Sequence, residues 1–85
     1  MGKDEKAKER LKRVPNDYTY SEARSLLIHL GFVECQKGRT SGSRVMFWRE
    51  SDRKKILLHK PHPGDVMSVS STRDLFRFLN ELGEI

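Results

Sequence analysis

The sequence predicts an α+β fold, a two-layer sandwich in which two helices cover one face of an antiparallel three-stranded sheet. Apolar residues recur at helical spacing after Thr19 and again after Ser71, and between these stretches apolar and polar residues alternate as in strands. The connections between the strands are short, which favours an antiparallel meander because parallel strands need a longer crossover. We therefore expect one small domain of 85 residues with the order α-β-β-β-α.

The composition indicates a polyanionic partner. Lys and Arg number 17 against 12 Asp and Glu, a formal net charge of +5. A single cysteine, Cys35, excludes an internal disulfide and fits a reducing compartment. Without a long apolar run or a signal-like N-terminus, we expect a soluble cytoplasmic protein. A chain this small buries only about 60% of its unfolded surface, so we expect no large enclosed cofactor.

Residues 1 to 14 predict a basic N-terminal extension, helical or disordered, ahead of a domain over residues 15 to 85. Most of these residues are charged or small, Leu11 and Val14 are the main apolar exceptions, and Pro15 ends the segment. An arm that contacts RNA is one interpretation. The mixture of positive and negative charges favours a solvated segment instead.

The first helix of the domain is expected to begin at a capping box formed by Thr19 and Glu22. In a capping box, the side chain of each residue accepts a hydrogen bond from the backbone N–H of the other. Gly31 predicts a left-handed residue just after the helix, followed by Phe32 in a Schellman ending. His29 lies in the last turn and is interpreted as structural. The apolar stripe that faces the core contains Ala23, Leu26, Leu27 and Leu30.

The last helix is expected to begin at Ser70 or Ser71, with Asp74 near the positive end of its dipole and Gly83 after its end. Its spacing at i, i+3, i+4 and i+7 predicts a second core-facing stripe. That stripe contains Leu75, Phe78, Leu79 and Leu82.

Three strands are expected over residues 32–36, 43–49 and 55–59, and their alternation separates two faces. One face, which suits a helix-covered core, contains Val45, Phe47, Ile56 and Leu58. The other contains Arg44, Met46, Trp48, Leu57 and His59, a large and partly basic set that favours a contact surface. The alternative is that Trp48 only covers the sheet edge or contacts the N-terminal segment.

The stretch from Leu57 to Asp65 is the most unusual part of the sequence, because it holds His59 and His62 in a proline-rich loop. Each proline restricts its own φ and that of the residue before it, so the loop is expected to be stiff. Histidine exchanges a proton near neutral pH, which suits chemistry on a phosphodiester. The alternative is a stiff connector whose histidines are incidental.

Several of these pieces together resemble the HicA toxins of bacterial toxin–antitoxin systems. The similarity covers residues 19 to 83, and its most specific parts are Gly31-Phe32, residues 42–47 (Gly-Ser-Arg-Val-Met-Phe) and residues 62–64 (His-Pro-Gly). The resemblance implies a fold like that of double-stranded-RNA-binding domains (dsRBD-like), mRNA cleavage, and neutralisation by a HicB-like antitoxin.

The chain departs from the family at its usual Gly-Ser-His motif, because Arg44 stands where the family has its catalytic histidine. Arginine stays protonated and cannot act as a general base, although it can bind phosphate. Either the chemistry has moved to His59 or His62, or the variant cleaves poorly or not at all. Longer family variants with Gly-Ser-Arg and a similar histidine loop look closer to this chain, which favours relocation.

The leading hypothesis is therefore a metal-independent endoribonuclease with His59 and His62 as proton-transfer groups, requiring no cofactor. Two histidines at i, i+3 without acidic or cysteine ligands are a weak metal signal. The alternatives are a non-catalytic RNA-binding module and a protein-interaction role, in which Met46, Trp48 and Leu57 contact the antitoxin. The expected RNA- or phosphate-binding residues are Arg44, Lys60, Lys37, Arg39 and Ser43.

Overall fold

The computed structural model describes residues 3–35, 44–61 and 63–85 of the chain. It confirms the α+β class and the antiparallel three-stranded sheet, in which β2 lies between β1 and β3. Within the described part, no helix combines the length and apolar character needed to cross a bilayer. The elements in chain order are α1 (Lys3–Lys12), α2 (Tyr20–His29), β1 (Val33–Cys35), β2 (Arg44–Arg49), β3 (Lys54–His59) and α3 (Val69–Glu81).

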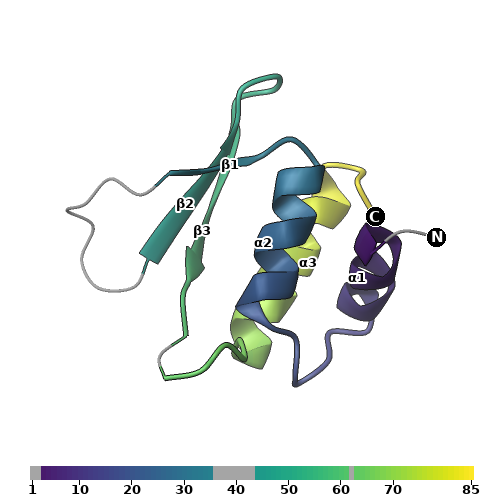
Figure 1. The fold of residues 1–85 in the computed structure, drawn as a ribbon. Coiled ribbons are helices and arrows are strands. Elements are labelled where there is room, and N and C mark those ends of the chain that lie inside the picture. The colour runs from purple at the N-terminus through teal and green to yellow at the C-terminus, as the bar shows by residue number, and fades with distance from the viewer. Residues whose placement is uncertain (1–2, 36–43, 62) are drawn as a thin grey trace.

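The helices and the sheet form layers (Figure 1). Helices α2 and α3 lie together on one side of the sheet, where α2 contacts β1 and α3 contacts β3. Helix α1 contacts α2 and α3 on their side away from the sheet. The opposite face of the sheet has no helix over it in the described part of the chain. We call it the open face.

The predicted alternation along the strands is confirmed. Val45, Phe47 and Leu58 are at most 5% exposed and belong to the core with residues of α2 and α3. On the open face, Leu57 is 51% exposed although it directly precedes buried Leu58. The period of two therefore divides each strand between a core side and an accessible side.

Local sequence signals at both ends of α2 are also confirmed. The Thr19 hydroxyl accepts the Glu22 N–H at 3.1 Å, and the Glu22 carboxylate accepts the Thr19 N–H at 3.0 Å. At the other end, Gly31 has φ of +96°, and the Phe32 N–H donates to the Leu27 carbonyl at 2.9 Å. This is the expected Schellman ending, and it directs the buried Phe32 back onto the core.

The predicted start of the last helix was wrong by two to three residues. The N-cap is Ser68, whose hydroxyl accepts the Ser71 N–H at 3.1 Å. The preceding Met67 is buried, and its N–H donates to the Tyr18 carbonyl at 2.8 Å, so the chain is held extended up to Ser68. Asp74 consequently lies beyond the first turn, where the dipole effect is weak.

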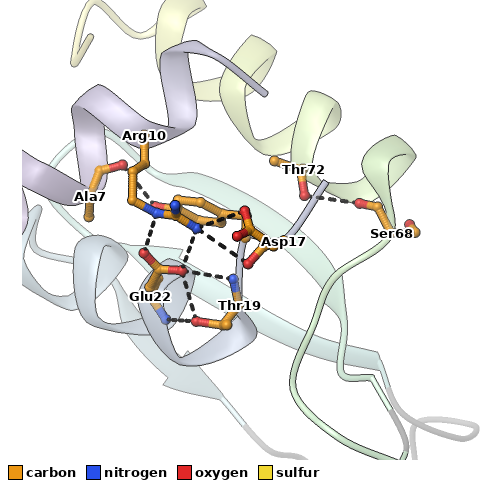
Figure 2. A network of polar contacts seen from close by, with 8 residues as sticks. Ala7, Arg10, Asp17, Thr19, Glu22, Ser68 and Thr72 are labelled. Carbon is orange, nitrogen blue, oxygen red and sulfur yellow. Dashed lines mark hydrogen bonds and ion pairs between the residues drawn. The ribbon is translucent and has the colours of Figure 1, made fainter. Parts of the chain in front are cut away.

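The N-terminal segment differs from the expected solvated extension, because α1 packs into the core. Leu11 is fully buried, Ala7 is 8% exposed, and the Tyr18 hydroxyl donates to the Ala7 carbonyl at 3.0 Å. Figure 2 shows Arg10 between two carboxylates, with Nε 2.8 Å from Glu22 and Nη2 3.2 Å from Asp17. Two apolar residues one turn apart thus pack against the core, and these polar contacts hold the same helix.

Candidate nucleic-acid interface

Two of the predicted functional residues meet on the open face. Arg44 is the first residue of β2, His59 is the last residue of β3, and the two are direct partners in the antiparallel register. Residues directly opposite each other project from the same face, with Cβ atoms about 4.5–5.5 Å apart. Both side chains are exposed. The register thus brings a permanent cation and an imidazole to one accessible place.

Lys60, another predicted phosphate-binding residue, lies on the other side of the sheet. Its Nζ is 5.9 Å from the centre of the Tyr20 ring, and Tyr20 is 3% exposed within the core. The Tyr20 hydroxyl donates to Glu34 at 2.9 Å, and Arg24 forms a 2.8 Å ion pair with the same carboxylate. Lys60 therefore belongs to a polar cluster beside α2, separate from the pair formed by Arg44 and His59.

The electrostatics of this cluster hold Glu34 in its charged form. Burial by itself raises the pKa of Glu34, but hydrogen bonds from Arg24 and Tyr20 outweigh it, and the pKa is lowered overall. Burial and the hydrogen bond to Glu34 raise the pKa of Tyr20 well above its usual value. Near neutral pH, Glu34 therefore stays charged and Tyr20 stays neutral, so neither is a proton-transfer group there.

The other predicted catalytic histidine, His62, lies outside the described residues. The same holds for Lys37, Arg39 and Ser43, so their contribution to phosphate binding stays a prediction.

The loop that follows His59 is fixed at its far end to the start of α2. The Asp65 carbonyl accepts the Tyr20 N–H at 2.7 Å, and the Asp65 carboxylate accepts the Ser21 N–H at 3.2 Å. Val66 then bridges to Thr19. Sequence reasoning missed this role of Asp65, because its partners lie more than forty residues away.

Two further cross-strand pairs extend the interface along the sheet. Met46 is opposite Leu57, and Trp48 is opposite Lys55. Met46 and Trp48 are half-buried, and the indole N–H of Trp48 donates to the Glu50 carboxylate at 3.3 Å. The sequence alone had not assigned Lys55, Val33 or Cys35 to this surface. Among the described strand residues, the open face contains Val33, Cys35, Arg44, Met46, Trp48, Lys55, Leu57 and His59.

The chemistry available on the open face is phosphate binding and proton transfer. Arginine presents a fork of donors that fits phosphate oxygens, and histidine can accept or donate a proton. Within the described residues, no group of three or more His, Cys, Asp or Glu is placed to hold a metal ion. The remaining described histidine, His29, is exposed at the end of α2.

Comparison with known proteins identifies no relative of this chain. No family model, no curated protein and no solved structure matches the chain. A function must therefore be argued from the residues and their arrangement.

Proposed function

We propose that this chain is a metal-independent endoribonuclease of the HicA type, the toxin of a toxin–antitoxin pair that acts on mRNA in the cytoplasm. The three antiparallel strands between α2 and α3 support a dsRBD-like fold, and Arg44 and His59 are opposite each other on the open face. The observation that carries the proposal is the cross-strand pairing of Arg44 with His59. That pairing puts a guanidinium, which can bind phosphate, beside an imidazole, which can accept or donate a proton.

RNA supplies its own nucleophile, so the enzyme needs few groups. A base takes the proton of the 2′-OH, the 2′-oxygen attacks phosphorus, and an acid protonates the departing 5′-oxygen. The products are a 2′,3′-cyclic phosphate and a free 5′-hydroxyl. His59 performs one proton transfer and His62 the other, while Arg44 neutralises the charge that develops on phosphorus. Each proton-transfer group contributes about 10²- to 10⁴-fold.

The test is cleavage of a single-stranded RNA in excess chelator by the wild type, three alanine variants of the proposed site and one control variant. His59→Ala and His62→Ala should each lose about 10²-fold or more of the rate, and Arg44→Ala should raise KM as well. His29→Ala is the matched control, because His29 is exposed but lies on α2 away from the open face. Unchanged activity in both His59→Ala and His62→Ala would refute the assignment.

The proposed antitoxin partner is a HicB-like protein that covers the open face. Leu57 is 51% exposed and lies opposite half-buried Met46, which gives a partner an apolar area beside the reacting pair. Co-expression with the product of the neighbouring gene, followed by co-purification, tests this. Leu57→Glu should abolish the complex, and recovery of the complex with this variant would contradict the assignment.

A second candidate function is a non-catalytic RNA-binding module. It is favoured by Arg44 itself, a phosphate ligand at the position where the HicA family has a histidine. In this case RNA binds with strong salt dependence, and no product forms at any enzyme concentration. The cleavage assay above separates the two functions.

A further inference from the structure

The open face has a linear order along β2 and β3. From one end to the other, the cross-strand pairs are cationic (Arg44 with His59), apolar (Met46 with Leu57) and aromatic with cationic (Trp48 with Lys55). The five residues from Arg44 to Trp48 are separated by four steps of roughly 3.4 Å, a span of about 14 Å. At a stacked rise of about 3.4 Å per nucleotide, that is up to four nucleotides of one strand.

Trp48 provides the aromatic end of this surface. Its neighbours on the open face are Val33 on one side, which is 61% exposed, and Lys55 on the other. The hydrogen bond from its indole N–H to Glu50, at 3.3 Å, fixes the direction of the ring. An indole that is oriented in advance can stack on any base, whatever its sequence.

The charges on this face complement a nucleic-acid backbone. Among the described residues, none of the side chains that β1, β2 and β3 place on the open face is acidic, and cations lie at both ends of the apolar middle. Phosphates can therefore lie near Arg44 and Lys55 while bases contact Met46, Leu57 and Trp48. One carboxylate adjoins the face, that of Glu50 in the turn beyond β2, which accepts the indole N–H at 3.3 Å.

Only a single strand can use this surface fully. In a duplex, the faces of the bases are stacked on one another, and side chains reach only base edges, sugars and phosphates. An unpaired strand exposes base faces that stack on aromatic side chains.

We propose that the substrate is single-stranded RNA, which lies along β2 with one base stacked on Trp48, up to four nucleotides from the phosphate that Arg44 binds. The inference rests on the proposed endoribonuclease only in that the bound RNA is called a substrate. Binding itself needs no cleavage, so the two can fail separately.

The experiment uses the single tryptophan of the chain, whose fluorescence reports on Trp48 alone. The probe is an eight-nucleotide single strand of 2′-O-methyl RNA, which lacks the nucleophile and cannot be cleaved by this route. We expect saturable quenching by the single strand. A blunt 2′-O-methyl duplex of the same sequence should give at most a small, non-saturating change.

Affinity is then measured by fluorescence anisotropy of the labelled single strand. Trp48→Ala should weaken binding by roughly 5- to 150-fold, the effect of losing one stacked base, and Trp48→Phe should recover part of it. Lys55→Gln should reduce the slope of log affinity against log salt by about one. Ile28→Ala is the control, since Ile28 is 42% exposed on α2. Circular dichroism confirms that each variant is folded.

Any one of the following results would overturn the inference: binding of the single strand without quenching, wild-type affinity in Trp48→Ala, or tighter binding of the duplex. Protection of Trp48 by a co-expressed protein, without RNA quenching, would assign the face to a protein partner and also overturn it. Quenching by the uncleavable strand, together with no cleavage of ordinary RNA, would refute the endoribonuclease and leave this inference standing.

Discussion

Replacing Leu11 by alanine tests whether α1 is part of the hydrophobic core. Leu11 is fully buried, and α1 is also held by the bond from the Tyr18 hydroxyl to the Ala7 carbonyl and by the ion pairs of Arg10. If α1 were a solvated extension, the substitution would change the free energy of unfolding by less than about 0.5 kcal/mol.

The expected magnitude follows from two limits. Truncating a core leucine to alanine costs about 2–5 kcal/mol when the surroundings cannot rearrange. Here α1 can detach, so the loss cannot exceed the free energy with which it docks. Burial of Leu11 contributes about 1.5–3 kcal/mol to docking, and the Tyr18 hydrogen bond contributes about 1 kcal/mol. We therefore expect a loss of about 2 kcal/mol, which lowers Tm by roughly 8–16 °C in a domain of this size.

The measurement is urea denaturation followed by far-UV circular dichroism. Leu57→Ala is the matched control, because it is the same change at a side chain that is 51% exposed on the open face. Hydrogen exchange should also show that amides in α1 lose protection in Leu11→Ala. Equal stability of the two variants would refute the docking of α1.

Three further predictions concern single interactions. Burial raises the pKa of Glu22, but hydrogen bonds, led by the one from Arg10, outweigh burial and lower the pKa overall. The ionised Glu22 carboxylate therefore stabilises the fold fully above about pH 4.5, and this contribution is lost as the pH falls further. Thermal melts of Glu22→Gln should thus show a shallower acid decline in Tm than the wild type, and parallel curves would contradict this. Gly31→Ala should cost about 1–2 kcal/mol in urea denaturation because φ is +96°, whereas wild-type stability would mean that this residue is not left-handed in solution. Arg49→Met removes ion pairs to Asp52 and Glu84 and should lower the free energy of unfolding by about 1.5–3 kcal/mol at low salt. The loss measured by urea denaturation should be smaller in 1 M salt. An unchanged free energy of unfolding would show that the pairs contribute nothing.

Features that depend on neighbours in the sequence were predictable. Thr19 and Glu22 form a capping box within one helical turn, and Gly31 ends the same helix, so both could be identified from a few residues. The division of Phe47 and Trp48 between two faces follows from strand alternation alone.

Features that depend on distant contacts were not predictable. Ser68, Ser70 and Ser71 are all acceptable N-caps by residue type, and the choice of Ser68 depends on the anchoring of Met67 against Tyr18. Lys60 follows the end of a strand, where alternation no longer determines direction, and Tyr20 on α2 attracts it.

Strand alternation predicts that Arg44 and His59 share a face, but their direct cross-strand pairing required the structure. Its register depends on the turn between β2 and β3, in which Arg53 has φ of +54°. A register shift of one residue would have placed either side chain opposite a core residue.

The alternation along β2 has a consequence for how this protein can change over time. Val45 and Phe47 maintain the fold, while Met46 and Trp48, interleaved with them, meet whatever approaches from outside. Substitutions of half-buried Met46 and Trp48 should cost the fold less than substitutions of buried Val45 and Phe47. The outward residues of β2 can therefore vary, by evolution or by design, while the residues that alternate with them stay unchanged.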